Sequence, residues 1–403
     1  MNVIKIAYAR TFQFFLRIAS KIVRFPIPMT KERLEDIPTL LNSNGLKCPI
    51  LIVSNTVSKG KRYESVIKML EANQIKYFPY IGIASDPTFK TIEVLAGFYK
   101  AHECDSIIAI GGGSVIDAAK AMGVLVSNKY KNLSRFKGVL KVKKKLPYFI
   151  AVPTTAGTGS EASIASVVTN EETKDKFAIS DGKLVPNVAI LDDSLLKGLP
   201  SELVATTGMD AFTHAIESYM NHAGNKKSKE YAKKSLYLIK NHLYEFYSDR
   251  ENDIARHNML YASFYAAISF TRSYVGYVHA LAHAIGGVYH KPHGYLIAIL
   301  LPYVLEAYGK KAYRALAKAS IEMGIGSNTS SREENALSLI SWIRELNQKM
   351  GIPNSLDNLI NEKDYLPLAE HASIEANPWY PVPKELDKNE LAFVLRKANS
   401  KNN

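Results

Sequence analysis

The pattern of apolar residues changes near residue 193, and this change constrains the fold more than any other feature of the chain. Before it, short apolar runs alternate with helical stretches; after it, nearly all of the sequence has helical spacing. With 403 residues, the chain is long enough for two domains. We therefore predict a basic amphipathic helix over residues 1–28, an α/β domain over residues 29–193 and an all-α domain over residues 194–403.

The α/β part predicts a mostly parallel sheet. Its apolar runs have strand length, and helical stretches such as residues 61–73 and 88–101 lie between them. Such alternation gives right-handed crossovers and a sheet covered on both faces. The stretch after Pro28 is predicted to be a linker and a short helix, and residues 188–191 are predicted to close the sheet. The other predicted strands are residues 50–54, 77–81, 106–110 and 148–152, with a hairpin over 166–180.

Two glycine-rich loops each follow a predicted strand. GGGS at residues 111–114 opens a helix, so its backbone can approach a pyrophosphate and its N–H groups can bind one. It is not the GxGxxG fingerprint, and glycine-rich turns between strand and helix are common. PTTAGTGSE at residues 153–161 is a stronger signal, because its hydroxyls suit a ligand with many hydrogen-bond acceptors. Two such loops at one edge of a sheet favour a nucleotide site over two solvated turns.

Two pairs of metal-ligating residue types have helical spacing in the second half. His279 and His283 are four residues apart, and so are Asp210 and His214. Residues with this spacing share one face of a helix, so each pair can offer two ligand atoms on the same side.

A cluster of histidines continues beyond the first of these pairs. Gly286, Gly287 and Pro292 are expected to break the helix, which places His293 on the loop that follows, after His290. One carboxylate and two or three imidazoles suit Zn(II) or Fe(II) better than Mg(II) or Ca(II). Any one of these histidines alone would more often be a core or surface residue, but the pairs and the cluster together predict a divalent metal site.

Composition argues against several other classes of protein. The net charge of +13 is spread along the chain, and no basic run is interleaved with aromatic residues as in a nucleic-acid groove. The two cysteines, Cys48 and Cys104, form no CxxC pair, which favours a reducing compartment, the cytoplasm. No uncharged apolar run is long enough to span a membrane, so no integral membrane segment is predicted.

The first 25 residues contain basic residues and no acid. Apolar residues recur there at helical spacing, but charges interrupt them, so the segment fits neither a signal peptide nor a membrane anchor. Such a helix most often docks on its own protein, and the alternative is weak contact with an anionic membrane surface.

Taken together, the motifs resemble the iron-containing, or group III, alcohol dehydrogenase family. The resemblance covers roughly residues 30–395. It implies a Rossmann-like nucleotide-binding domain of the dehydroquinate synthase type, followed by a helical metal-binding domain. It also implies an enzyme that transfers a hydride between a small alcohol or aldehyde and NAD(P), and that forms a homo-oligomer, in the simplest case a dimer. The segments that carry it are GGGSVIDAAK, PTTAGTGSE, GMDAFTHAIESY, VHALAHAIGG and KPHG, in that order along the chain.

The resemblance further implies the residues of the site. Asp210, His214, His279 and His293 would bind one divalent metal, with Fe(II) ranked first and Zn(II) second. His283 would be the catalytic histidine beside nicotinamide and substrate, or else would orient a ligand. The implied cofactor-binding residues are Asn55, Gly112, Gly113, Ser114, Asp117, Thr154, Thr155, Thr158, Lys176 and Leu195.

The sequence departs from the family pattern in ways that leave the cofactor and the substrate open. Asn55 stands where many NAD-preferring members have an aspartate that repels a 2′-phosphate, and basic residues follow at 59–62, so NAD and NADP both stay open. Arg272 and Tyr274 stand where better-studied members have small or amide residues near the expected substrate pocket, so the alcohol is not identified.

Other activities are compatible with the same architecture. A dehydroquinate synthase-like lyase would need several cations for a polyanionic substrate, and the motif segments hold few beyond Lys176, Arg272 and Lys291. A glycerol dehydrogenase-like enzyme is a further alternative. A non-catalytic nucleotide-binding or membrane-surface protein is disfavoured because all four candidate metal ligands are present.

Overall fold

The computed structural model describes residues 3–23, 25–84, 86–128, 132–172 and 175–400. The chain divides into two compact units. One unit is Phe25–Lys197, and the other joins Met1–Arg24 to Gly198–Asn403. The first helix therefore belongs with the helical part of the chain, although the whole α/β unit separates the two in sequence.

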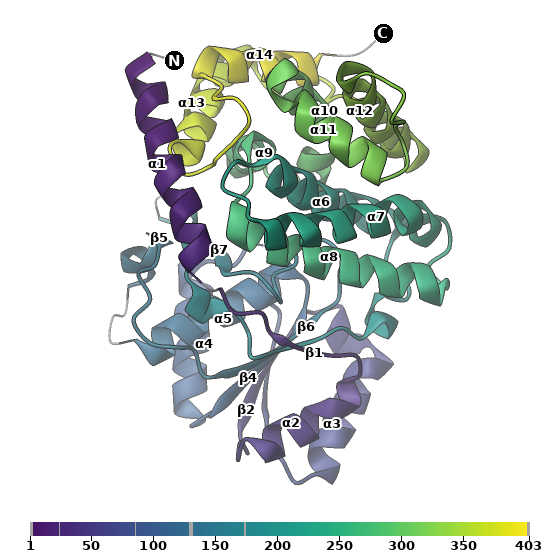
Figure 1. The fold of residues 1–403 in the computed structure, drawn as a ribbon. Helices are drawn as coiled ribbons and strands as arrows, with labels where there is room; N and C mark the ends of the chain where they lie inside the picture. Colours follow the sequence, from purple (N-terminus) through teal and green to yellow (C-terminus); the bar gives the residue numbers. More distant parts are fainter. Residues whose placement is uncertain (1–2, 24, 85, 129–131, 173–174, 401–403) are drawn as a thin grey trace. The chain divides into compact units, whose positions relative to one another are not determined.

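Six strands of the unit Phe25–Lys197 form one sheet, in which every neighbouring pair is parallel. The strand order is β1-β9-β6-β4-β2-β3 (Figure 1). This arrangement confirms the parallel sheet predicted from the alternating pattern. The strands are β1 (Met29–Lys31), β2 (Pro49–Val53), β3 (Phe78–Ile81), β4 (Ser106–Gly111), β6 (Tyr148–Pro153) and β9 (Val188–Ile190).

Both faces of this sheet are buried, which explains why its strands read as continuous apolar runs. The helices that cover it are α2 (Ile37–Ser43), α3 (Lys61–Ala72), α4 (Phe89–Ala101) and α5 (Gly113–Ser127). Ile50 and Ile52 of β2 join the apolar cluster that includes residues of α4 and α5. Leu51 and Val53, which point to the opposite face, join the cluster that includes α2 and α3.

Two features of the sheet differ from the expectation. Residues 29–31, predicted as part of a linker, form β1, in which Met29 pairs with Val188 of β9. The segment at 188–191 was expected to close the sheet, but β9 lies between β6 and β1, so β1 is the edge strand. A strand of three residues is too short to show the period that identifies strands in a sequence.

A smaller sheet with strand order β5-β8-β7 accompanies the large one. Its strands are β5 (Gly138–Val139), β7 (Ala165–Asn170) and β8 (Asp175–Ser180). β7 and β8 are antiparallel, which confirms the predicted hairpin.

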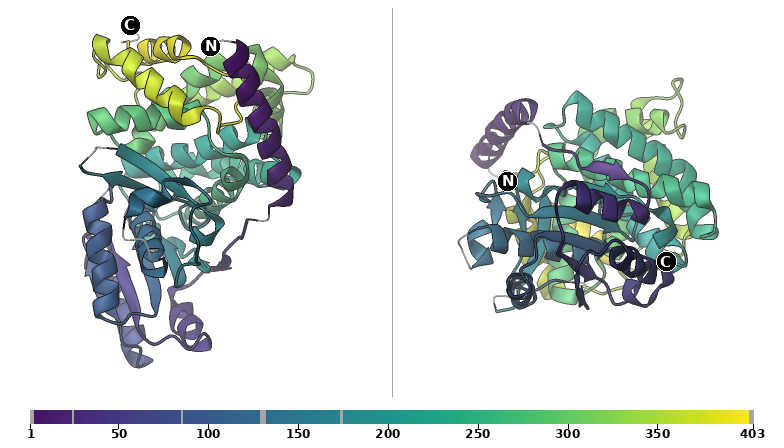
Figure 2. Two further views of the ribbon diagram at one scale, coloured as in Figure 1. Left: turned by 90° about the vertical axis from the view of Figure 1, so that its left-hand side faces the viewer. Right: turned by 90° about the horizontal axis from the view of Figure 1, so that it is seen from below.

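The second unit contains helices as its regular structure among the described residues, and α6 runs through its interior (Figures 1 and 2). The side chains of α6 are buried continuously from Gly208 to Met220. No helix among the described residues is long and apolar enough to cross a membrane. The helices of this unit are α1 (Val3–Ile22), α6 (Ser201–Met220), α7 (Lys226–Ser248), α8 (Asp253–Ser273), α9 (Tyr277–Tyr289), α10 (His293–Tyr308), α11 (Lys310–Glu322), α12 (Arg332–Lys349), α13 (Tyr365–Ala376) and α14 (Lys388–Asn399).

A buried lysine of α5 anchors the loop that follows β6. The ammonium group of Lys120, fully buried, donates to the backbone oxygens of Ser163 (2.9 Å) and Ala165 (2.8 Å). Asp117, one turn earlier, accepts from the Ser160 hydroxyl and from the N–H of Val167. These bonds fix the loop between β6 and β7 against the helix that opens with the GGGS turn.

Glu161 lies in the same loop and has a strongly perturbed acidity. Its side chain is 1% exposed, and its Oε1 has no hydrogen-bond partner among the described residues. Burial raises the pKa of Glu161 to about 7, although a backbone hydrogen bond and the charge of Lys120 oppose the shift. The loop therefore contains a carboxyl group that resists ionisation.

Glu161→Gln is expected to remove part of the dependence of stability on pH. With the folded pKa raised to about 7 and the unfolded value near 4.5, the folded protein holds the proton longer. This carboxyl group therefore reduces the free energy of unfolding as pH rises from about 4.5 to about 7, by up to about 3 kcal/mol. Urea unfolding at a series of pH values should show Glu161→Gln gaining stability over wild type across that window, whereas exposed Glu93→Gln should follow wild type. Parallel profiles for all three proteins would contradict the assignment.

Candidate metal centre and cofactor loops

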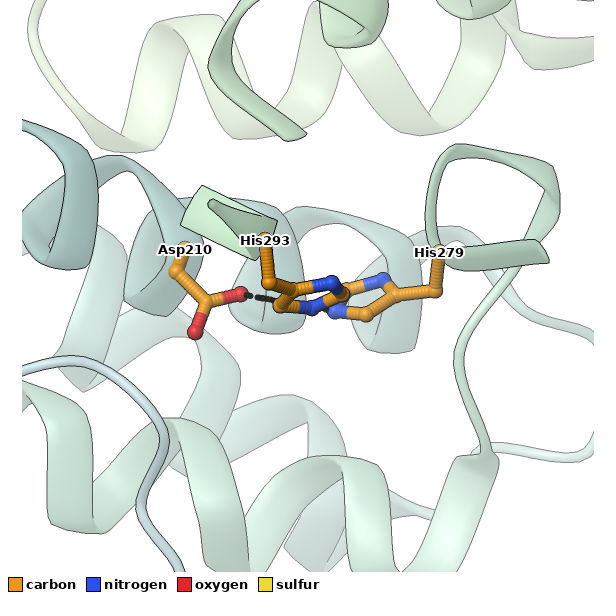
Figure 3. A group of neighbouring side chains, drawn as sticks. All are labelled: Asp210, His279 and His293. Atoms are coloured by element: carbon orange, nitrogen blue, oxygen red, sulfur yellow. Dashed lines mark ion pairs between the residues drawn. The ribbon is translucent and has the colours of Figure 1, made fainter. Parts of the chain in front are cut away.

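The carboxylate of Asp210 is surrounded by three histidine side chains of the helical unit. It lies on the buried helix α6 with an exposed side-chain fraction of 3%. Its Oδ1 is 3.6 Å from Nε2 of His279, 3.7 Å from Nε2 of His293 and 3.9 Å from Nδ1 of His214. Figure 3 shows Asp210, His279 and His293 pointing toward one another from three helices.

Three of the four predicted metal ligands form one compact group. Asp210, His279 and His293 each offer a ligand atom within 4.8 Å of the others. His214 lies beside them, with its ring stacked on that of His279 at a centroid distance of 4.4 Å. His214, the fourth predicted ligand, therefore lies next to this group but is not one of the three residues whose ligand atoms are within 4.8 Å of one another.

The atoms of this group suit a divalent cation. Asp210 Oδ1 and His279 Nε2 are buried and have no hydrogen-bond partner among the described residues. Ligand bonds of about 2.1 Å in tetrahedral geometry place donor atoms about 3.4 Å apart, close to the separations seen here. Buried polar atoms without partners are costly, and a cation at their common centre would satisfy them. The donor set of one carboxylate and imidazoles matches Fe(II) or Zn(II).

Glu217, also on α6, orients His279 from the other side of its ring. Glu217 Oε2 is 2.6 Å from His279 Nδ1, so this nitrogen donates to the carboxylate and Nε2 is directed at Asp210. The carboxylate also accepts from the N–H groups of Gly276 (2.7 Å) and Val278 (2.9 Å) at the start of α9. A Cβ at Gly276 would lie 2.6 Å from Glu217 Oε1, so only glycine allows this approach.

His293 reaches the group through the first turn of α10. The sequence predicted that Gly286, Gly287 and Pro292 break the helix before it and that His293 lies on the loop that follows. The helix does end before Pro292, but it runs through both glycines, and the loop position of His293 is wrong. α9 continues to Tyr289, and His293 is the first residue of α10, after Pro292. A Cβ at Gly294 would lie 2.6 Å from the backbone oxygen of Thr206, so glycine lets this turn pack directly on α6.

Neighbouring charged groups shift the pKa values of Asp210 and His279 away from their ordinary values. Burial opposes ionisation of Asp210, but the adjacent imidazoles of His214, His279 and His293 hold its pKa below the ordinary value. Burial likewise disfavours a charged His279, yet Glu217 and Asp210 outweigh it and raise the pKa of His279 to about 9. The environment of His279 thus favours positive charge, which a divalent cation also supplies.

His283 lies one helical turn after His279 and belongs to a second hydrogen-bonded group. Its Nδ1 is 2.8 Å from Glu375 Oε1, which also accepts from the Tyr380 hydroxyl at 2.8 Å. The ring of His283 stacks on that of His293 with a centroid distance of 5.1 Å. His283 is therefore next to the metal ligands, and a carboxylate fixes its orientation.

Other residues singled out in the sequence lie elsewhere or have structural contacts. His290 is exposed and caps the C-terminus of α9 in a left-handed conformation. Arg272 donates to the backbone oxygen of Ile268 on its own helix at 2.7 Å. Tyr274 ends α8 with a φ of 65°, and the amide of Asn221 binds the three carbonyls of residues 273–275.

In the α/β unit, the two glycine-rich loops lie side by side. They follow β4 and β6, which pair along their length up to Gly111 and Pro153. The N–H of Thr154 donates to the oxygen of Gly111 at 3.1 Å. A Cβ at Gly113 would lie 2.8 Å from the Thr158 side chain, so the loops pack tightly because this residue is glycine. The carboxyl edge of the sheet thus presents backbone N–H groups and hydroxyls together, as a dinucleotide site requires.

Asn55 follows β2, the strand on the other side of β4. The backbone N–H of Ser54 donates to the oxygen of Ile110 at 3.3 Å, which places this turn beside the GGGS loop. A Cβ at Gly82, which has a φ of +102°, would lie 3.4 Å from Asn55 Oδ1. The predicted cofactor residues at 55, 112–114 and 154–158 therefore follow three adjacent strands.

The remaining predicted cofactor residues have other contacts. Asp117 binds the loop after β6, as described above. Lys176 on β8 forms an ion pair with Asp86. Leu195 packs against the apolar cluster on one face of the sheet. Sequence reasoning did not identify Glu217, Glu375 or Lys120; only Glu217, seven residues after Asp210 and hence on the same face of α6, had a usable signal.

Comparison with known proteins gives a consistent result. The family model described as iron-containing alcohol dehydrogenase matches residues 27–193, and that of the C-terminal domain of the Fe-containing alcohol dehydrogenase family matches residues 204–399. Alcohol dehydrogenase 4 of Saccharomyces cerevisiae is 33% identical over 368 residues, covering 91% of this chain and 94% of its own. The NADPH-dependent butanol dehydrogenase of Clostridium saccharobutylicum is 33% identical, covering 88% and 92%. The solved alcohol dehydrogenase from Oenococcus oeni superposes with a TM-score of 0.89 at 30% identity, covering 93% and 99%.

Glu217→Gln is expected to weaken metal binding without unfolding the protein, because glutamine keeps the shape but loses the charge that orients His279. A change of this kind typically lowers metal affinity about 10- to 100-fold. The measurement is the iron or zinc retained after dialysis against a competing chelator, determined by elemental analysis. Glu202→Gln, an exposed change in the first turn of α6, should retain metal like wild type. If Glu217→Gln retained as much metal as this control, the orienting role would be excluded.

Proposed function

The chain belongs to the iron-containing alcohol dehydrogenase family and is an NAD(P)-dependent alcohol dehydrogenase, and on that premise we propose which residues carry the reaction and which cofactor and substrates it takes. The observation that carries the proposal is the convergence of Asp210, His279 and His293 on one point. The proposed reaction is the reversible transfer of a hydride between a small alcohol or aldehyde and NADP(H).

The proposed metal ligands are Asp210, His214, His279 and His293, and Fe(II) is the first choice with Zn(II) second. A cation bound there would polarise the alcohol or aldehyde oxygen and stabilise negative charge on it. The ligands themselves are held in place before any cation binds, because Glu217 fixes His279 and the close packing at Gly294 fixes His293. This preorganisation reduces the cost of assembling the site.

The nicotinamide dinucleotide would accept the hydride from the alcohol or return it to the aldehyde. We assign its pyrophosphate to Gly112, Gly113 and Ser114, which form the N-terminal turn of α5, where the helix dipole and backbone N–H groups favour an anion. The hydroxyls of Thr154, Thr155 and Thr158 and the side chain of Asn55 line the same edge of the sheet, and they are assigned to the nucleoside portions. Asp117 is assigned to holding the hydroxyl loop in place.

We assign proton transfer to His283. Its Nδ1 is bound to Glu375, so Nε2 is the nitrogen that can exchange a proton with the substrate oxygen or with water. Glu375 stabilises the protonated imidazole, and Tyr380 holds the carboxylate through its hydroxyl. The three side chains form a chain of hydrogen bonds from the interior toward the metal ligands.

We propose NADP(H) as the preferred cofactor. An amide at Asn55 lacks the negative charge with which an aspartate would repel a 2′-phosphate, and Lys59, Lys61 and Arg62 are exposed in the turn and helix that follow. The NADPH-dependent butanol dehydrogenase, a relative with 33% identity, is consistent with this choice. Small aliphatic alcohols and their aldehydes are the proposed substrates, and we place the enzyme in the cytoplasm as a homo-oligomer, where its free Cys48 and Cys104 would stay reduced.

His283→Ala is expected to reduce kcat by about 100-fold, the typical contribution of a general acid–base group, while the metal content stays that of wild type. The measurement combines steady-state kinetics with elemental analysis of the same samples. His290→Ala serves as the matched control, because this exposed histidine lies on the same segment away from the cluster. Loss of metal together with activity would instead make His283 a ligand.

The function itself is tested by anaerobic purification, metal analysis and a panel of alcohols and aldehydes with NADH and NADPH in parallel. Wild type should contain iron or zinc and should have a higher kcat/KM with NADPH than with NADH.

Asn55→Asp should shift the NADPH-to-NADH ratio of kcat/KM about tenfold toward NADH, because the new carboxylate repels the 2′-phosphate of NADPH and bonds the ribose of NADH. Asn42→Asp adds the same charge at an exposed position of α2 and should leave the ratio unchanged. A wild-type preference for NADH would refute the proposed cofactor. Activity with no member of the panel would refute the proposed substrate class.

A further inference from the structure

Helix α1 is docked on its unit through hydrogen bonds of its polar side chains as well as through apolar residues such as Ala9, which is 2% exposed. Arg10 donates to the backbone oxygens of Val382 (2.8 Å) and Pro383 (3.2 Å). The amide of Gln13, 4% exposed, donates to the oxygen of Tyr380 (3.0 Å) and to Glu385 (2.8 Å). Figures 1 and 2 show the helix running along the outside of its unit.

The same mode of docking continues toward the end of the helix. The Ser20 hydroxyl donates to the oxygen of Ala223 at 3.0 Å, and the amide of Asn225 donates to the oxygen of Ser20 at 3.2 Å. An apolar contact accompanies these bonds where Phe12 meets the edge of Trp379, with ring centroids 4.9 Å apart. The inner side of α1 is therefore specified by hydrogen bonds along its length.

The outer side of α1 is apolar and exposed. Tyr8, Phe15 and Ile18 are 64%, 62% and 41% exposed, and Phe14 is 58% exposed. Their spacing of three, four and seven residues places them on one side of the helix, together with exposed Thr11. At 1.5 Å per residue, this stripe is about 15 Å long over the described side chains from Tyr8 to Ile18. Four large apolar side chains on one face are unusual for a surface in contact with water only.

Exposed positive charges lie near the C-terminal part of α1, where Ser20 contacts Asn225 at the start of α7. Arg17 on α1 is exposed, as are Lys229 on α7 and Arg314 and Lys318 on α11. Glu322 lies among these cations, and its ion pairs with Lys233 of α7 at 3.3 Å and with Lys318 of α11 at 3.9 Å bring the cations of these two helices close together. The pKa of Lys229 is lowered, by desolvation first and then by the positive charges of Lys318, Arg17 and Arg314. The first acidic residue of the chain is Glu32, beyond the helix.

We propose that the outer face of α1 binds the surface of an anionic membrane, with its apolar stripe between the lipid headgroups and the cations beside it on the phosphates. An apolar stripe bordered by lysine and arginine is the pattern of helices that lie in the plane of a bilayer. No helix among the described residues can cross a membrane, so this is a surface contact. A second copy of the chain is the weaker candidate occupant, because two copies of α1 would bring two sets of like charges together.

The test is sedimentation of the full-length enzyme with two kinds of vesicle, phosphatidylcholine alone and a mixture with about one third phosphatidylglycerol. Wild type should pellet with the anionic vesicles, less so at high salt, and should stay in solution with the neutral ones. The variant Phe14→Ser, Phe15→Ser, Ile18→Ser should bind the anionic vesicles at least about tenfold more weakly. Arg17→Gln with Arg314→Gln should also bind more weakly and should lose part of the salt dependence.

The matched control replaces three exposed apolar residues of other helices, namely Tyr237, Tyr244 and Ile254, by serine. It should pellet like wild type. Melting temperature and dehydrogenase activity should be unchanged in every variant, because none of these side chains contacts the metal or cofactor residues. Failure of wild type to bind anionic vesicles, or equal binding by the apolar variant, would overturn the proposal. A smaller oligomer for the apolar variant in sedimentation velocity would also overturn it and would assign the face to a second copy.

Discussion

The candidate metal site depends on one electrostatic constraint, the burial of two carboxylates on the same helix, α6. Asp210 and Glu217 lie on the same face of α6 with side-chain exposures of 3% and 1%. A buried carboxylate is very costly unless positive charge or hydrogen-bond donors compensate it. Here the imidazole of His279 lies between the two, with one nitrogen toward each. A divalent cation bound by Asp210 and His279 would add to this compensation, so the proposed metal site would also stabilise the core.

Close backbone approach makes this arrangement geometrically feasible. Glu217 reaches the first N–H groups of α9 only because Gly276 has no side chain, and His293 reaches Asp210 only because Gly294 lets α10 begin against α6. The same close approach occurs in the α/β unit, where the missing side chain of Gly113 leaves room for Thr158. In each case a glycine adjacent to a polar residue of the site sets the distance at which two elements pack.

The sequence predicts much of this fold because its signals are local. Spacing of four residues identifies Asp210 with His214 and His279 with His283, and apolar runs identify the strands. Glu375 was missed because its partner His283 is 92 residues away, and no local pattern connects them. β1 was missed because three residues show no period, and its pairing with β9 is a tertiary property. His293 was expected in a loop after Gly286, Gly287 and Pro292. Instead α9 runs through both glycines, at a propensity cost of about 1 kcal/mol each, and Pro292 is the N-cap of α10, whose first residue is His293.

The amphipathic pattern of helix α1 did not predict which side of the helix faces the protein. Periodicity locates an apolar stripe on a helix but does not state which side faces the protein, and the usual assumption is that apolar residues face inward. In this chain the docking surface includes carbonyl groups at residues 380–383, and Arg10 and Gln13 donate to three of them. These hydrogen bonds help to hold the inner side, and the apolar stripe from Tyr8 to Ile18 faces outward. The orientation of an amphipathic helix therefore follows from the chemistry of the surface that receives it as much as from its own pattern.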